Sequence, residues 1–454
     1  MTGKIWANSA LLASGWADSV EIKIDAMGNI ATISPDLPYT DGDRVEVLLP
    51  AIPNVHSHAH QRAMAGLGER AGDTRDSFWT WRKVMYHYLE RIQPDNLFHI
   101  AAQLYLEMLK AGYSCVGEFQ YLHHDLNGQV YDNPAEMSVQ CLQAATQVGI
   151  GFTALPVLYR YGGFDSAAAL DGQKRFLNDA DGFVEIVKRL QSTTTNDTNC
   201  SVGIAPHSLR AINRELLTEV IASLEGLAAI HVHVAEQARE VDDCLDWSGK
   251  RPVEWLFENF AVDRKWCLIH ATHINDQETA AMAGSGCVAG LCPTTEANLG
   301  DGFFNAPEYF AQRGCWAIGS DSHISIDPVE ELRWLEYGMR LQTHGRNVLV
   351  SDANANTGRN LLDGALAGGA RACGRNIGSI VEGYRADFVI LDDEHPRLYG
   401  RSRDDLIDSW IFSGNSNLVR DVYIGGNKVI NHGHHVDEDS IARNYRNTLD
   451  ELAD

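Results

Sequence analysis

The sequence predicts an α/β fold: a TIM-type (β/α)8 barrel joined to a small, discontinuous β-sandwich domain built from both termini. Two observations lead to this prediction. Several apolar runs end in histidine, glutamate or aspartate, and the first of them, residues 47–52, leads to His56 and His58. Strands of a parallel barrel are buried on both faces and carry functional groups at their carboxyl ends. In addition, both ends of the chain read as short alternating strands, and they flank a middle in which strands and helices alternate.

The expected barrel strands follow one another in the order that β/α units require. A long polar insertion and a helical stretch, roughly residues 94–111, follow the first strand, and helical patterns such as residues 214–224 and 252–259 separate later strands. The strands are expected over residues 47–52, 114–119, 151–158, 201–207, 228–236, 266–273, 286–293 and 315–322.

The β-sandwich domain is expected to combine residues 1–48 with residues 378–435. The second of these segments includes residues 419–430, which have a strand–turn–strand character like that of the N-terminal segment. The barrel is then expected over residues 49–377, and a C-terminal helix over residues 436–454.

Composition narrows the classes of function. The chain has 454 residues, of which 44% are hydrophobic and 22% charged, as in ordinary globular proteins. Its formal charge of −24 disfavours nucleic acid and anionic membranes as partners. No apolar stretch of about 20 residues occurs, the N-terminus lacks the layout of a secretory signal, and nine cysteines are scattered without a Cys-x-x-Cys pair. We therefore expect a cytoplasmic protein with reduced thiols.

Four strand-end residues have the chemistry of a metal site. Residues i and i+2 of a strand point to the same face, so His56 and His58 present two imidazoles side by side. With His233 and Asp321 they form a set of nitrogen and oxygen ligands for a divalent transition ion, with a position left for water. Such an ion lowers the pKa of bound water to about 7. The alternative is that the strand-end histidines only cap the barrel with hydrogen bonds.

Further polar residues at strand ends suggest acid–base chemistry. His231 shares a strand face with His233 and competes for the ligand role, but His233 is favoured because Glu236 then stands at the barrel mouth as a proton carrier. His270 is expected to orient the attacking hydroxide or polarise the scissile group, and Asp321 to accept the proton of the water. The alternatives are a solvated loop carboxylate for Glu236 and a core histidine for His270. Loop or supporting roles are expected for three other histidines: His60, His273 and His323.

These residues resemble the mononuclear deaminase branch of the amidohydrolase superfamily, and the resemblance covers nearly the whole chain. More narrowly, the chain resembles the formimidoylglutamate deiminases of histidine degradation at residues 61–66, 205–211, 231–237 and 291–302. The resemblance implies hydrolysis of N-formimidoyl-L-glutamate to N-formyl-L-glutamate and ammonia, with one zinc per chain, in a cytoplasmic homodimer. Fe²⁺ or another divalent ion is the alternative to zinc. A second metal is not expected, because the fourth strand does not end in the lysine with which two-metal relatives usually bridge their ions.

The same resemblance implies five contacts to a small dicarboxylate substrate, and arginines suit such a substrate because they bind carboxylates in a bidentate manner. The implied contacts are Gln61, Arg82, Tyr121, His207 and Arg210. Two rival functions stay open. A deaminase of a purine, pterin or triazine ring would need aromatic stacking and amide groups rather than two arginines. A barrel that has lost catalysis and acts as a scaffold would not need an intact ligand set.

Overall fold

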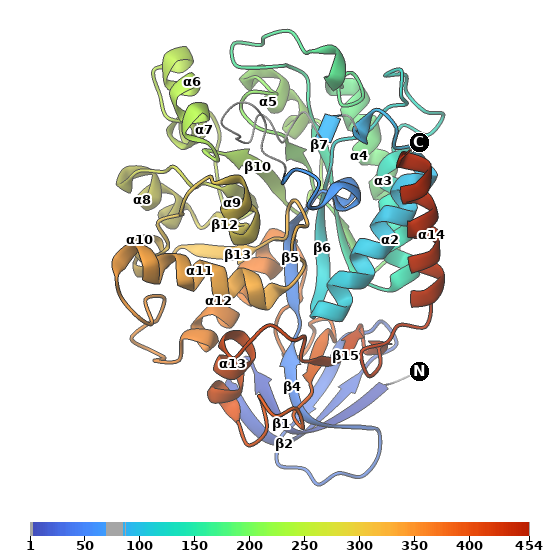
Figure 1. Cartoon of the computed structure of the whole chain (residues 1–454), viewed down its shortest axis with the longest axis vertical. Coiled ribbons are helices and arrows are strands. Elements are labelled where there is room, and N and C mark those ends of the chain that lie inside the picture. Colours follow the sequence, from blue (N-terminus) through green and yellow to red (C-terminus); the bar gives the residue numbers. More distant parts are fainter. Residues whose placement is uncertain (1–2, 70–84, 87, 454) are drawn as a thin grey trace.

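The computed structural model describes residues 3–69, 85, 86 and 88–453. Figure 1 shows a group of parallel strands with helices on the outside, above a separate β-sheet at the lower end of the molecule. The coarse prediction of parallel α/β units with an extra β domain is therefore confirmed. The details differ in two places, at the first strand and at the fourth strand.

The parallel strands form two sheets. One has the order β5-β6-β7-β8, with β9 paired to β7, and the other has the order β10-β11-β12-β13. Isolated parallel bridges, Ser57–Asp321 and Ser208–His233, join the edges of the two sheets, but no continuous ladder closes them into a ring. The strands are β5 (Ile52–Ser57), β6 (Tyr113–Gln120), β7 (Gly151–Leu158), β8 (Cys200–Val202), β9 (Ala205–Pro206), β10 (Ile230–Val234), β11 (Trp266–His270), β12 (Val288–Leu291) and β13 (Cys315–Ile318).

The expected fourth strand is divided into β8 and β9. Gly203 lies between them, and a Cβ atom at this position would stand 2.4 Å from the carbonyl oxygen of Ala229. Only glycine permits such a close approach of two backbones. The strand therefore breaks where it passes the chain segment that leads into β10.

Helices connect most of the parallel strands, as β/α units require. The expected helices over residues 94–111 and 252–259 are present with these bounds, and the one expected over residues 214–224 ends at Ala222. Asn213 caps it by accepting a hydrogen bond from the backbone of Leu216. The helices are α2 (Pro94–Ala111), α3 (Glu136–Val148), α4 (Ala180–Thr194), α5 (Arg214–Ala222), α6 (Ala238–Ser248), α7 (Pro252–Asn259), α8 (Asp276–Ser285), α9 (Pro293–Leu299), α10 (Ala306–Ala311), α11 (Pro328–Thr343), α12 (Thr357–Ala372), α13 (Arg403–Phe412) and α14 (Glu438–Ala453), with short 3-10 turns η1 (Ala59–Met64) and η2 (Asp171–Gln173).

Both ends of the chain build the extra sheet. It is a single hydrogen-bonded mixed sheet of seven strands in the order β16-β15-β14-β4-β1-β2-β3. The central strand β4 pairs in parallel with β1 and antiparallel with β14, so it joins the N-terminal strands to the C-terminal ones. The strands are β1 (Gly3–Leu12), β2 (Gly15–Ile24), β3 (Ile30–Ser34), β4 (Asp43–Pro50), β14 (Phe388–Leu391), β15 (Val419–Ile424) and β16 (Asn427–Ile430).

The first apolar run of the sequence, residues 47–52, was expected to be one barrel strand, and this was wrong. Its first part belongs to β4 of the mixed sheet, whereas β5 begins at Ile52, with Ala51 alone between the two strands. The apolar pattern runs unbroken through this boundary because Leu48 and Leu49, like Ile52, are completely buried. One continuous piece of chain thus ties the extra sheet to the strand that carries His56.

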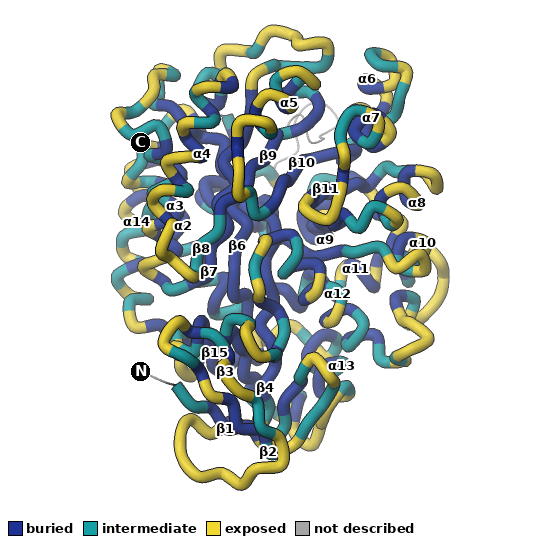
Figure 2. Tube along the Cα trace, turned by 180° about the vertical axis from the view of Figure 1, so that it is seen from behind, coloured by how far each residue is buried: buried dark blue, intermediate teal, exposed yellow. Residues whose placement is uncertain are grey.

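Figure 2 shows the parallel strands as a buried centre with exposed residues on the surrounding helices. A separate core cluster fills the mixed sheet, with Ile22 and Phe388 from opposite ends of the chain among its fully buried members. The C-terminal helix α14 lies along α2, and Arg91, three residues before α2, donates to the carbonyl of Leu452 at 2.8 Å. Among the described residues, no helix has both the length and the apolar character that a membrane span needs.

Candidate metal centre and active-site cavity

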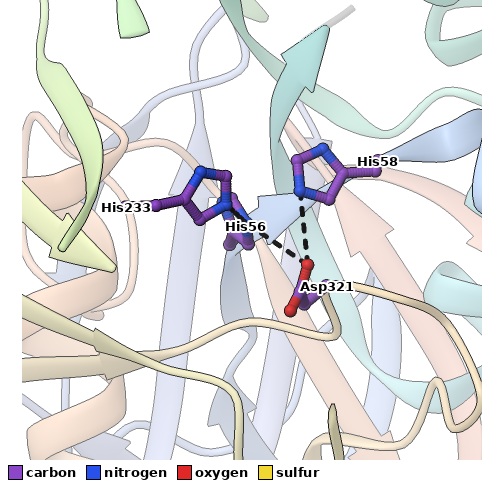
Figure 3. Close-up of side chains that lie close together, drawn as sticks. All are labelled: His56, His58, His233 and Asp321. Atoms are coloured by element: carbon purple, nitrogen blue, oxygen red, sulfur yellow. Dashed lines mark hydrogen bonds and ion pairs between the residues drawn. The ribbon is translucent and has the colours of Figure 1, made fainter. Parts of the chain in front are cut away.

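Three histidines and one aspartate converge at the carboxyl ends of the parallel strands. His56 is the last residue but one of β5, His58 lies just beyond the strand, His233 lies in β10, and Asp321 follows β13. Figure 3 shows the four side chains pointing toward one another. The Nε2 atoms of His56 and His58 each lie 3.3 Å from Oδ1 of Asp321, and Nε2 of His233 lies 3.0 Å from Nε2 of His56. All four residues are buried, and their ligand atoms lie within 4.8 Å of one another.

The hydrogen bonds of this cluster prepare it for a metal ion. Nδ1 of His58 lies 2.9 Å from the carbonyl oxygen of Phe119, and Nδ1 of His233 lies 2.9 Å from that of His207. Because a carbonyl only accepts, each Nδ1 carries the hydrogen and each Nε2 presents a lone pair to the centre of the cluster. Burial lowers the pKa values of His56, His58 and His233, and metal binding requires the neutral form.

The spacing of the cluster also fits a metal ion. Ligands at 2.0–2.1 Å from a tetrahedral ion stand about 3.3 Å apart, close to the separations of 3.0–3.3 Å found here. Nε2 of His233 directs its lone pair at Nε2 of His56, and Nδ1 of His56 has no hydrogen-bond partner among the described residues. The residues present therefore fit a divalent metal.

A buried carboxylate holds the segment between the first two histidines. Glu118, on β6, accepts hydrogen bonds from Oγ of Ser57 at 2.6 Å, from the backbone of Ala59 at 2.8 Å and from the hydroxyl of Tyr105 at 2.9 Å. Burial raises the pKa of Glu118 to about 7, although the three donors oppose this rise. These bonds fix the turn on which His58 stands.

His323 ties the same segment to the loop after β13. Its Nε2 accepts from the backbone N–H of His58 at 3.1 Å, and its Nδ1 lies 3.1 Å from Oγ of Ser320. Ser320 immediately precedes Asp321, so the imidazole spans the first and last parallel strands. His323 thus has the supporting position that the sequence suggested for it.

Acid–base groups lie next to the metal cluster. Nε2 of His270 lies 3.7 Å from a carboxylate oxygen of Glu236 and 3.7 Å from Oδ2 of Asp321, and its Nδ1 lies 3.3 Å from Glu296. Burial raises the pKa of Glu236 to about 7. Burial also lowers the pKa of His270, but Glu236, Glu296 and Asp321 outweigh it and raise this pKa to about 10. The arrangement can hold and pass protons near the metal cluster.

Several of these residues have strained backbones. The φ angles are +67° at His270, +46° at Asp321 and +52° at Ala235, the residue before Glu236. A positive φ costs a residue other than glycine roughly 1–3 kcal/mol, and such strain concentrates at functional sites. Here it turns the chain sharply at the strand ends and directs the side chains into the cluster.

A cavity of about 730 Å³ opens above the cluster. Its lining includes the expected Glu236, His270 and Asp321, together with four of the five expected substrate contacts: Gln61, Tyr121, His207 and Arg210. The fifth, Arg82, lies outside the described residues. The hydroxyl of Tyr121 is 2.8 Å from Nε2 of His60, which places His60 beside the cavity wall rather than in the cluster.

The surroundings of His231 and His233 indicate which of the two can be a metal ligand. Nε2 of His231 lies 2.8 Å from the carbonyl oxygen of Ala372, the last residue of α12, while His233 belongs to the cluster. Strand parity alone could not distinguish them, because both side chains lie on the same face of β10.

Sequence reasoning missed one side of the cavity. Arg239, Asp243 and Trp247 line it from α6, and Phe164 stacks on Trp247 at 5.3 Å between ring centroids. Their spacing of four residues along one helix face was a usable signal, because the helix follows directly after Glu236.

Two family models match the chain. The model described as "Amidohydrolase family" matches residues 47–429, and "Formimidoylglutamate deiminase HutF, N-terminal domain" matches residues 2–46. The formimidoylglutamate deiminase of Pseudomonas aeruginosa is 49% identical over 99% of both chains. This chain belongs to the amidohydrolase family. Within that family it groups with the formimidoylglutamate deiminases.

Solved structures and a further curated relative are also similar to this chain. A solved amidohydrolase from Brucella melitensis superposes with a TM-score of 0.95, at 46% identity and with 100% of both chains covered. An adenosine deaminase from Xanthomonas campestris, solved with bound zinc, gives a TM-score of 0.80 at 20% identity, covering 99% of this chain and 98% of that one. A 5-methylthioadenosine/S-adenosylhomocysteine deaminase from Thermodesulfovibrio yellowstonii is 23% identical over 90% of this chain and 86% of its own length. The fold of this amidohydrolase is thus shared with a deaminase of a different name.

Proposed function

We propose that this amidohydrolase hydrolyses N-formimidoyl-L-glutamate to N-formyl-L-glutamate and ammonia, a step of histidine degradation. The observation that carries the proposal is the 49% identity to the P. aeruginosa formimidoylglutamate deiminase over practically the whole of both chains. The cavity supports it, because Arg210 lies in the same lining as the acid–base groups and could bind a substrate carboxylate.

The metal is proposed to be one zinc ion per chain, held by His56, His58, His233 and Asp321. The support is a set of three neutral imidazoles and one carboxylate, which is typical of zinc, although Fe²⁺ could use the same ligands. When bound, such an ion supplies a water of lowered pKa and polarises the substrate.

Side chains of the protein then transfer the protons of the reaction. Asp321 accepts a proton from the attacking water, and Glu236 delivers one to the departing nitrogen. Oxygen adds to the amidine carbon, the carbon–nitrogen bond breaks, and ammonia leaves while the formyl group stays on the glutamate nitrogen. His270, held by Glu236 and Glu296, orients the reacting oxygen.

The remaining cavity residues are proposed to recognise the substrate. Arg210 and Arg82 bind the two carboxylates, since each guanidinium can form paired hydrogen bonds with a carboxylate. Gln61, Tyr121 and His207 position the formimidoyl end, and these three lie beside the metal cluster in the cavity lining.

We also propose the larger organisation implied by the family. The two parallel sheets represent one closed eight-stranded barrel over residues 49–377, supported by the bridges at both edges. Residues 1–48 and 378–435 then form the β-sandwich domain, residues 436–454 the C-terminal helix, and the protein is a cytoplasmic homodimer.

An ammonia-release assay tests the function. Purified, metal-loaded protein is given N-formimidoyl-L-glutamate, and guanine and S-adenosylhomocysteine in parallel, at equal concentrations. We expect rapid ammonia release from formimidoylglutamate alone. Preference for a ring substrate would establish a purine deaminase instead, and no release from any compound by fully metallated protein would favour the scaffold.

A further inference from the structure

A second cavity lies at the opposite end of the parallel strands from the metal cluster. It has a volume of about 780 Å³. Its lining includes Ala228, which precedes β10, and Lys265, which directly precedes β11, whereas His233 and His270 lie near the other ends of those strands. Most of the remaining lining comes from α12 and the loop after it, with further residues from the ends of β1 and β4. Figure 1 shows this junction, where α12 lies next to the mixed sheet.

The lining of this cavity is rich in cationic side chains, whereas the chain as a whole is acidic. The whole protein contains 37 lysines and arginines against 61 aspartates and glutamates. Among the described residues that line the cavity, by contrast, five are cationic and only Asp363 is acidic. The cationic residues are Arg264, Lys265, Arg359, Arg371 and Arg375. Such a local excess of positive charge favours anions even though the molecule as a whole repels them.

Some of these cationic side chains have hydrogen-bond or ion-pair partners within the protein, and others have donors that a ligand could use. Arg359 pairs with Asp363 at 2.8 Å, and Arg371 donates through Nη1 to the carbonyl of Gly286 at 3.0 Å. Within the described part of the chain, the side chains of Arg264 and Lys265 have no hydrogen-bond or ion-pair partner. The cavity therefore combines anchored and uncommitted positive groups.

Backbone donors reinforce the positive charge. Gly378, Ser379 and Ile380 line the cavity, and among the described residues none of their backbone N–H groups has an acceptor. Gly378 has a φ of +71°, and a left-handed residue in a turn directs successive N–H groups to one side. Concave groups of backbone N–H are a common means of binding phosphate and carboxylate oxygens.

We propose that this cavity binds a small anion with at least two negative charges, of the phosphate or dicarboxylate class. Arginine and lysine side chains with unpaired backbone donors match several oxygens at once. The site goes beyond the proposed function and does not depend on it, since it lies at the other end of the strands. Its ligand would contact α12, whose Gly368 and Gly369 lie against Trp316 and Pro53, next to the strands that lead to Asp321 and His56.

Isothermal titration of the metal-loaded, full-length protein tests the proposal. The probes are pyrophosphate and glutarate, each at constant ionic strength, because surface attraction falls with salt. The test variant is Arg264→Gln/Lys265→Gln. A matched control, Lys188→Gln/Arg189→Gln, removes the same two charges from an exposed part of α4. Arg210→Met serves as a second control, because it weakens dicarboxylate binding in the active-site cavity only.

We expect the Arg264→Gln/Lys265→Gln variant to weaken binding of one probe by at least about tenfold, as for the loss of charge-assisted hydrogen bonds. Both controls should leave that binding event unchanged, and the test variant should keep its melting temperature and its basal turnover. If the Arg264→Gln/Lys265→Gln variant loses pyrophosphate binding, the ligand belongs to the phosphate class. If this variant loses a glutarate-binding event that the Arg210→Met variant retains, the ligand belongs to the dicarboxylate class. Equal affinities of the test variant and the Lys188→Gln/Arg189→Gln control for both probes would overturn the proposal.

Discussion

Replacing Arg210 by methionine should separate substrate recognition from catalysis. Methionine keeps the apolar length of the side chain and removes the guanidinium. Removing one partner of a buried charge pair costs about 2–5 kcal/mol in binding. Because Arg210 is only partly buried, we expect the lower part of this range, about 2–3 kcal/mol, or roughly a 30- to 150-fold fall in kcat/KM for formimidoylglutamate.

The assay compares two substrates so that effects on the chemistry cancel. Arg210 also lowers the pKa of the nearby Glu236, so its loss could change turnover for any substrate. The ratio of kcat/KM for formimidoylglutamate to that for an analogue lacking one carboxylate reports recognition alone. We expect this preference to shrink in Arg210→Met and to stay unchanged in Arg214→Met, an exposed position four residues further on. Metal content and melting temperature should match the unchanged protein. An unaltered preference in Arg210→Met would refute carboxylate recognition by this residue.

Three further predictions concern the metal centre. Elemental analysis should find one metal ion per chain in the parent protein and almost none in a His233→Ala variant. Two ions per chain in the parent protein would contradict the proposed set of four ligands. Glu236→Gln should keep the metal and lose about 10²–10⁴-fold in kcat, and near-normal turnover of metal-replete variant would place the proton carrier elsewhere. Glu118→Gln should weaken metal retention by about 10–100-fold, measured by competition with a chelator, because the turn carrying His58 loses its carboxylate support. Unchanged retention would show that His323 suffices to hold this turn.

The sequence allowed much of the fold to be predicted, because buried parallel strands leave a clear pattern. Continuous apolar runs ending in polar residues placed the parallel strands, and the period of two along a strand put His56 and His58 on one face. The boundary between β4 and β5 was missed because hydrophobicity does not change across it. The break at Gly203 was missed because it results from a neighbouring backbone that is distant in sequence.

The parts of the candidate site that depend on tertiary contacts were harder to predict from the sequence. The metal cluster could be expected from strand ends alone, because parallel strands bring those ends together. Nothing in the local sequence indicates that Glu296 lies 3.3 Å from Nδ1 of His270, since the two residues belong to different β/α units. The contribution of α6 to the cavity wall likewise depends on how that helix is tilted over the strands.

The direct connection between β4 and β5 has a consequence for how the protein is made. As the chain leaves the ribosome, β4 and the histidine pair after it emerge within the first 60 residues, but β14, which pairs with β4, is not complete until residue 391. Until then β4 presents an unpaired edge, and exposed strand edges invite aggregation. We therefore expect nascent chains to depend on chaperones over most of their synthesis. Prematurely terminated products should be insoluble rather than partially active.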